Sequence, residues 1–304
     1  MSAPPRLTDY MLLVSLAAIW GSSFMLIKVA IGTVPPVTIT AARVVIGAMI
    51  LTAVAIAARR RLPSAPRVWG FAFLSGLFGF ALPFTLISWG EERIDSGPAA
   101  ILMAGMPLVT ILLARFVVGD EPLPANKIIG VVCGVIGLVV LIGPAELATL
   151  GGNSVREIAV VLASFCYAVN AITAKRIAGQ DPYATSAAIL ICGSLLLVPA
   201  SLLLERPWTL SPSPEAWLAL VLLGALSTAA ATLIMLTLLR RQGAGFFAQN
   251  NFLVPLFGVF WGFLILSERP PAQSLAALAI IMIGIAISRG RAGPQRLVPL
   301  EVRK

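Results

Sequence analysis

Polar side chains inside long apolar stretches are the residues of this chain whose types and spacing suit chemistry. Trp20 and Ser23 lie three positions apart, on one face of a helix, and Tyr167 and Asn170 repeat the pattern 147 positions later. An aromatic face attracts a cation, and a hydroxyl or amide can bond a polar ligand. We therefore predict that these four residues line a central cavity. The alternative is that they are packing contacts between membrane helices.

Arg43 is the most deeply placed charge, about 10 Å along its apolar stretch at roughly 1.5 Å per helical residue. A guanidinium at that depth is costly unless it faces a cavity or a partner. We predict that Arg43 attracts a carboxylate in an outward-facing vestibule; the alternative is an arginine that snorkels to the outer surface. Lys28 lies near a helix end, as does its counterpart Lys175, and snorkelling is the favoured interpretation for both.

The amide triplet Gln249, Asn250 and Asn251 is the most polar segment inside any apolar stretch. Its counterpart in the first half, Ile101–Met103, is apolar, so the fold alone does not require the amides. Successive helical residues are about 100° apart, so at most two of the three can share a face. We predict that one or two meet the central pathway and that the remainder bond a neighbouring helix.

Pro83, Pro107 and Pro255 lie within apolar stretches, where a proline removes a backbone hydrogen bond and bends the helix. We predict that they act as hinges; a static kink that shapes the bundle is the alternative. Phe80 and Phe84 flank Pro83 and are predicted to form an aromatic wall of the cavity, although contact with lipid suits phenylalanine equally well.

The thirteen acidic residues all lie in predicted loops or at the ends of predicted helices, and the chain has no histidine. Acid–base and metal chemistry need such groups at the reacting centre. An intramembrane lipid enzyme is therefore disfavoured, and no metal or cofactor is expected. Glu121 and Glu268 recur at helix ends and are interpreted as caps, since carboxylates favour helix N-termini. With no carboxylate or histidine at membrane depth, ion coupling is not expected.

The elements that must position these residues are membrane helices. The chain is 59% hydrophobic and 12% charged, with a mean hydropathy of +0.96, whereas soluble domains are usually about 25% charged. We predict an all-α integral membrane protein, because each helix that spans a bilayer needs about 20 apolar residues. Ten stretches qualify: Tyr10–Ile31, Pro36–Ala58, Arg67–Trp89, Gly97–Val118, Pro124–Gly143, Val155–Ala178, Pro182–Leu204, Glu215–Leu239, Gly245–Leu266 and Pro271–Arg289.

The basic residues predict the orientation. If the N-terminus is cytoplasmic, sixteen Lys and Arg residues lie on the cytoplasmic side and four on the other. This asymmetry places both termini in the cytoplasm and the Leu147–Ser154 loop outside. The net charge of +9 is therefore a membrane-orientation signal, and no nucleic-acid partner is expected.

The chain is an internal duplication. A shift of 147 positions carries Trp20 onto Tyr167 and Glu121 onto Glu268, which predicts repeats over residues 1–147 and 148–304. Each repeat has five spans, an odd number, so the second must enter the membrane with opposite polarity. Two inverted five-helix repeats around a midplane site are typical of secondary transporters.

The chain resembles the drug/metabolite transporter superfamily, in particular its EamA-type exporters and, among these, YddG-like amino-acid exporters. The resemblance covers Met11 to Ser288 and rests on the five-plus-five span pattern, WGSSF at Trp20–Phe24, Pro107, Glu121–Pro122, and Glu268 with Pro270. It implies export of amino acids or similar small metabolites from a bacterial inner membrane. A monomer in the lipid bilayer is compatible with it.

The candidate residues bear on the cargo. Aromatic rings, amides and one arginine suit a small zwitterion, because a carboxylate can pair with Arg43 and an ammonium can meet Trp20 or Tyr167. A neutral or aromatic amino acid is the favoured small-molecule substrate. A sugar phosphate, a nucleotide sugar or a hydrophobic drug remains the alternative within the superfamily, although a phosphate usually meets several cations.

Overall fold

The computed structural model describes residues 5–110, 125–143, 153–177 and 179–289, and its regular structure within these ranges is helical. The α-helices are α1 Leu7–Ala30, α2 Pro36–Ala57, α3 Pro66–Gly76, α4 Leu82–Glu91, α5 Ser96–Met103, α7 Ala125–Ile142, α9 Ser154–Lys175, α10 Pro182–Leu204, α11 Pro214–Gly224, α12 Ala231–Phe247, α13 Asn250–Leu266 and α14 Ala272–Arg289. Two π-helical segments, Leu77–Ala81 and Ala225–Ala230, join α3 to α4 and α11 to α12.

These elements confirm the predicted spans. Eight continuous helical stretches of 18 or more residues are apolar enough to cross a membrane, and two shorter ones, Ser96–Thr110 and Ala272–Ser288, complete the set. Each π segment lies inside one span, so Pro66–Glu91 and Pro214–Gly243 each cross as a single unit. Residues 111–118 of the fourth predicted span lie outside the described ranges.

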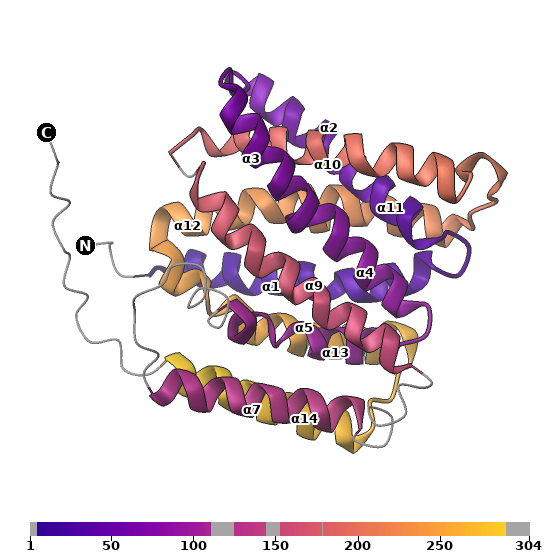
Figure 1. Cartoon of the computed structure of the whole chain (residues 1–304), viewed down its shortest axis with the longest axis vertical. Coiled ribbons are helices and arrows are strands. Elements are labelled where there is room, and N and C mark those ends of the chain that lie inside the picture. The colour runs from indigo at the N-terminus through magenta and orange to yellow at the C-terminus, as the bar shows by residue number, and fades with distance from the viewer. Residues whose placement is uncertain (1–4, 111–124, 144–152, 178, 290–304) are drawn as a thin grey trace, which may run out of the picture.

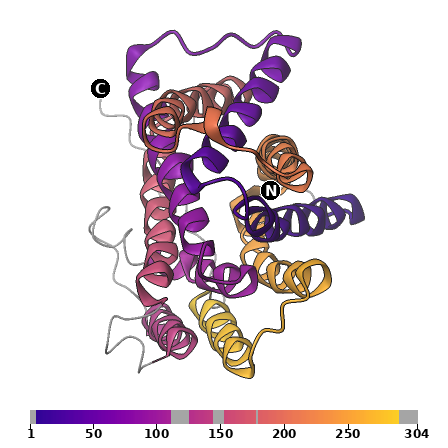
Figure 2. The same cartoon turned by 90° about the vertical axis from the view of Figure 1, so that its right-hand side faces the viewer.

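The helices form one bundle, and different helix pairs lie at the two extremes of the longest axis of the molecule, which is vertical in Figure 1. In both views α7 and α14 lie side by side at the end away from α2 and α3 (Figures 1 and 2). At the other end α2 packs against α10, and between them α1 packs against α13 and α4 against α9. The start of α1 and the end of α14 lie on the same side of the bundle (Figure 1).

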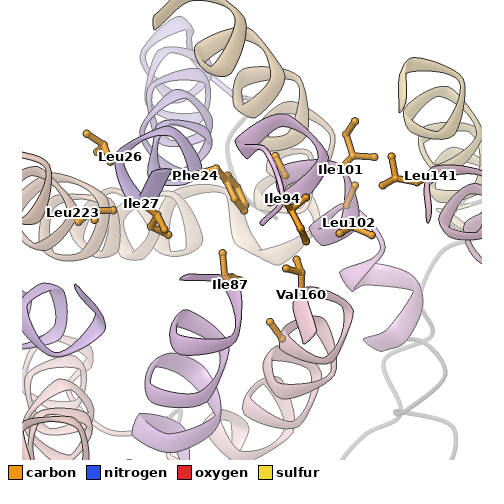
Figure 3. Close-up of a cluster of buried hydrophobic side chains, with 14 of the residues drawn as sticks. Phe24, Leu26, Ile27, Ile87, Ile94, Ile101, Leu102, Leu141, Val160 and Leu223 are labelled. Atoms are coloured by element: carbon orange, nitrogen blue, oxygen red, sulfur yellow. The ribbon is translucent and has the colours of Figure 1, made fainter. Parts of the chain in front are cut away.

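The core gathers residues from both halves. Figure 3 shows Phe24 and Ile27 of α1 near Ile87 of α4, with Val160 of α9 and Leu223 of α11 nearby, and all five are buried. Many outward-facing positions are equally apolar, which is expected where lipid replaces water. Helix association in lipid depends on close packing rather than on burial of apolar surface from water.

Close packing recurs at equivalent positions of the two halves. The π segments begin 148 positions apart, and each follows a glycine, Gly76 or Gly224. A Cβ atom on Gly76 would lie 2.8 Å from the Ile189 carbonyl oxygen of α10, and one on Gly224 would lie 2.5 Å from Ile46 Cβ of α2. In each half, the helix that carries the π segment therefore packs closely against a helix of the other half. The same contact is made twice, as expected for two repeats.

The three predicted hinge prolines have different surroundings. Pro255 lies inside α13, as predicted. Pro83 is the second residue of α4, directly after the first π segment, and Pro107 follows a turn at Ala104–Gly105 instead of lying in mid-helix. The second π segment forms without a proline, because Ala231 occupies the position of Pro83. The proline is thus not what creates the π segment, and the hinge role stays a prediction.

Candidate functional site

A cavity of about 230 Å³ lies between the halves and reaches the connection between α9 and α10. That connection is on the predicted cytoplasmic side. We therefore call this end of the spans the inner end, and the opposite end, which is predicted to lie outside, the outer end. The cavity walls come from α2, α9, α10, α12 and the first π segment, and the lining residues with polar side chains are Asn170, Gln180, Thr185, Ser186 and Thr232. A mixed polar and apolar wall built by both repeats is suited to a small amphipathic molecule.

Asn170 and Phe80 are the predicted site residues that line this cavity. The Asn170 side chain lies against Gly79, where a Cβ atom would come within 2.7 Å of Nδ2. Its Oδ1 is buried and has no hydrogen-bond partner among the described residues. A buried amide oxygen without a donor is destabilising, so this atom is suited to receive a hydrogen bond from a cargo molecule or water.

Arg43 and Phe84 do not line the cavity but are linked to it through Phe80. The Phe80 and Phe84 ring centroids are 5.5 Å apart, and the guanidinium carbon of Arg43 lies 3.7 Å from the Phe84 centroid. Arg43 Nε donates a hydrogen bond to Thr228 Oγ1 over 2.9 Å. Arg43 is 4% exposed, so it does not snorkel, and the predicted open vestibule above it is closed in this structure.

The first-half counterparts of Tyr167 and Asn170 lie elsewhere. The Trp20 ring packs edge-on against Phe247, with centroids 6.1 Å apart, and is not among the lining residues. Ser23 is buried, and its Oγ has no hydrogen-bond partner among the described residues. Tyr167 packs between the two largest core clusters. The cavity lining comes mostly from the second half, so equivalent residues of the repeats are not equally placed around it.

The amide triplet lies inside the span Gly245–Leu266, as predicted, but a turn at Ala248–Gln249 interrupts the helix there. Gln249 is in the turn before the helix, and Asn250 and Asn251 are its first two residues. Asn250 is buried with its Oδ1 unpartnered in the described structure, whereas Gln249 and Asn251 are half-buried. This agrees with the expectation that three successive amides cannot share a face, but none of them lines the cavity.

Glu205 closes the outer end between α2 and α10. Its carboxylate accepts hydrogen bonds from the backbone nitrogens of Val37 and Thr38, over 3.0 and 2.6 Å, and from Thr38 Oγ1 over 2.8 Å. A second-half carboxylate therefore caps the N-terminus of a first-half helix, where the helix dipole favours negative charge. Sequence reasoning missed this contact, since Glu205 and Val37 are far apart in the chain.

Glu268 makes a second contact of the same kind. It accepts hydrogen bonds from the backbone nitrogens of Ser96 and Gly97, over 2.9 and 3.0 Å, and from Ser96 Oγ over 3.0 Å. The prediction that Glu268 is a cap is confirmed, and the helix that it caps is α5 of the other repeat. Glu121, its predicted counterpart, lies outside the described residues.

Lys28 and Glu91 are two further charged residues of the outer end. Lys28 Nζ donates to the carbonyl oxygens of Glu91 and Ile94 over 3.0 and 2.7 Å and lies 3.5 Å from Asp95, so it caps the end of α4 instead of snorkelling. Lys175, its counterpart, is exposed. Glu91 is at a helix end, as predicted, but it is fully buried, and both carboxylate oxygens lack a hydrogen-bond partner in the described structure. The sequence places Glu91 correctly at a helix end but does not reveal that its carboxylate is buried.

Comparison with known proteins identifies the family. A profile of the EamA-like transporter family matches residues 8–143 and 156–290. The uncharacterized transporter YoaV of Bacillus subtilis is 24% identical over 275 residues, covering 90% of this chain and 94% of that protein. A probable amino-acid metabolite efflux pump of Escherichia coli is 26% identical over 292 residues, with 92% and 94% covered.

Two further similarities extend this result. An S-adenosylmethionine/S-adenosylhomocysteine transporter of Chlamydia trachomatis is 27% identical over 282 residues, covering 88% of this chain and 85% of that protein. A crystal structure matches with a TM-score of 0.65 at 22% identity, over 93% of this chain and 98% of the other, which shows a shared fold. Because the family profile covers both halves, the protein belongs to the EamA-like transporter family.

Proposed function

We propose that this multi-pass membrane transporter exports a small zwitterionic metabolite, such as an amino acid with a neutral or aromatic side chain. The observation that carries the proposal is the cavity, which is lined by the unpartnered Asn170 oxygen and the Phe80 ring. The Phe80 ring contacts Phe84, and the buried cation Arg43 stacks on Phe84. At about 230 Å³ the cavity is smaller than the roughly 300–1,000 Å³ of sites for drug-sized ligands. The name of the E. coli relative supports the same cargo class.

Alternating access of two inverted repeats is the proposed mechanism. The pattern of helix contacts supports the inversion, because it is retained when the halves are exchanged. α1 packs against α13 as α9 packs against α5, and α4 packs against α9 as α12 packs against α1. With both termini in the cytoplasm, the structure corresponds to an inward-facing state, in which the cavity is accessible from the cytoplasm and the outer end is closed.

In this mechanism the cargo enters from the cytoplasm and meets Phe80 and Asn170 first. Its carboxylate then approaches Arg43, whose terminal nitrogens are suited to a charge-assisted pair. Opening of the outer end and closing of the inner end release the cargo. A ligand can shift this equilibrium only by binding the two states differently, and a bridge between residues of both repeats provides such a difference.

Counterflow in proteoliposomes tests the proposal with a panel of radiolabelled neutral amino acids. Asn170→Ala should raise the half-saturating concentration about tenfold, which corresponds to one buried hydrogen bond at about 1.4 kcal/mol. Arg43→Leu should strongly reduce uptake of the amino acid and should reduce far less the uptake of the corresponding amino-acid amide, which lacks the carboxylate. Asn153→Ala, an exposed amide outside the cavity, is the matched control and should behave as the parent. Normal uptake in the Asn170 and Arg43 variants, or no uptake of any member of the panel by the parent, would contradict the proposal.

A further inference from the structure

Glu91 is a buried acid that the proposed transport cycle has not used. It is the last residue of α4, it is 0% exposed, and neither carboxylate oxygen has a hydrogen-bond donor in the described structure. It lies on the helix face that also carries Phe84 and Ser88, both buried, at spacings of seven and three residues. The acid therefore lies two turns beyond Phe84, at the outer end of α4.

The charged groups around Glu91 are engaged elsewhere. Lys28 bonds backbone carbonyls and pairs with Asp95, and Glu268 bonds the start of α5. Arg43 bonds Thr228 and stacks on Phe84. The elements packed against α4 carry these titratable and charged groups toward the outer end and the middle of the spans: Lys28 of α1, Arg43 of α2, Arg156, Glu157, Cys166 and Tyr167 of α9, and Asp95 and Glu268 beside α5. Asp9 and Tyr10 of α1 and Lys175 of α9 lie at the inner end.

Arg156, the remaining cation among them, bonds Glu92 and the Trp89 carbonyl. None of these cations forms an ion pair with Glu91 in the described structure, where its carboxylate has no hydrogen-bond partner. An ionised carboxylate without a donor or a paired cation is strongly disfavoured in a buried position, whereas the neutral acid is tolerated. Water that enters when the outer end opens would solvate and stabilise the ionised form.

We propose that Glu91 is a proton-binding site that takes up one proton as the outer end closes and releases it as the outer end opens. The step is –COO⁻ + H⁺ → –COOH, and the proton comes from water on the outer side. The closed state then holds one proton more than the open state. The open-to-closed ratio therefore rises with outer pH, by up to about tenfold per pH unit while one proton is exchanged. Only the alternating-access part of the proposed function is assumed.

The test reads outer opening directly and needs no cargo. Cys133, Cys166 and Cys192 are replaced by Ala, and Ser88→Cys, buried one turn before Glu91, is labelled in cells with a membrane-impermeant thiol reagent at outer pH 6, 7 and 8. Trp208→Cys, at a position 67% exposed in the outer loop, corrects for the reactivity of the thiol itself. The corrected labelling should rise with pH in the parent and be independent of pH after Glu91→Gln. The matched control Glu92→Gln, which removes the neighbouring ion-paired carboxylate, should keep the pH dependence.

A pH dependence that survives Glu91→Gln, or labelling that follows sodium concentration at constant pH, would overturn the proposal. If the Gln variant does not insert, infrared difference spectra between pH 6 and 8 provide a second measurement on the parent. A carbonyl band of a protonated acid must be present at low pH and must shift after Glu91→Asp, and absence of the band contradicts the proposal. Failed amino-acid counterflow with intact pH-dependent labelling would contradict only the proposed cargo.

Discussion

The outer and inner ends of the bundle are built from equivalent helices but are held differently. At the outer end, Glu205 and Glu268 of the second half bond the starts of α2 and α5 in the first half. At the inner end, α10, the counterpart of α2, is capped by Asp181 within its own half, through Tyr183 N and Ala184 N over 3.1 and 3.0 Å. Asp181 also pairs with Arg60 of the first half over 3.5 Å. The two ends therefore differ in where a carboxylate of one half caps a helix of the other, and we infer that these caps favour the closed outer end.

One type of contact is present at both ends and therefore does not distinguish them. At the inner end Asp9 of α1 accepts a hydrogen bond from Gln242 of α12 over 2.8 Å and lies 3.4 Å from Arg241. At the outer end the charges are exchanged, and Arg156 of α9 pairs with Glu92, which directly follows α4. We infer that α1 with α12 and α9 with α4 keep these contacts in both states, so the capping carboxylates are the bonds that change.

A covalent lock at the outer end should have the largest effect. Thr38 Oγ1 and Ser201 Oγ lie 2.8 Å apart between α2 and α10, which brings the two side chains close enough for a disulfide. In a background without native cysteines, Thr38→Cys with Ser201→Cys should abolish counterflow after oxidation, and a reductant should restore it. Each single cysteine variant is the control. Full transport by the oxidised double variant would mean that α2 and α10 need not separate at this end.

Removal of the capping charges should have an intermediate effect. Glu205→Gln or Glu268→Gln weakens bonds to a helix N-terminus, and such caps contribute about 0.5–2 kcal/mol. Outer labelling of Ser88→Cys should then rise by roughly two- to thirtyfold. Glu215→Gln, a carboxylate in the first turn of α11 on the same side, is the matched control and should leave the labelling unchanged. Equal labelling in all three variants would mean that these caps do not hold the outer end closed.

The smallest expected effect is the difference between substitutions of the two equivalent lysines, Lys28 and Lys175. Lys28→Ala removes bonds to two carbonyl oxygens at the end of α4, whereas Lys175→Ala removes an exposed side chain that has no hydrogen bond or ion pair among the described residues. Lys28→Ala should raise the outer labelling of Ser88→Cys a few-fold, because a partly exposed charged contact contributes only a small free energy. Lys175→Ala should leave the labelling of the inward-facing state near the parent value. An equal effect of the two lysines would mean that the ends are not held differently.

The helices were predictable from the sequence for a direct physical reason. A span needs about 20 apolar residues, and short breaker-rich loops separate the stretches, so most boundaries agree within a few residues. The role of Glu268 as a cap was also predictable, because the residue recurs at a helix end. The turn before α13 was not, since neither Ala248 nor Gln249 is a residue that usually breaks a helix.

The candidate site was predictable only in part, because burial depends on which end is closed. Asn170 lines the cavity while Ser23, its repeat counterpart, is enclosed, and the two cannot be distinguished by a sequence pattern. The partners of Glu205 and Lys28 lie far away in the chain. Glu91 appeared to be an ordinary acid at a helix end, since its burial comes from α1, α2 and α9 packing around α4.

The π segments have a consequence for the angular phase of the helices that carry them. A π segment adds one residue to a turn, and one residue corresponds to a rotation of about 100° in an α-helix. The face of Phe84, Ser88 and Glu91 comes after Leu77–Ala81, so an uninterrupted α-helix would direct this face toward a different neighbour. A helical wheel drawn through the whole span therefore misplaces the second part of it, and relatives of this protein are best compared separately before and after each π segment.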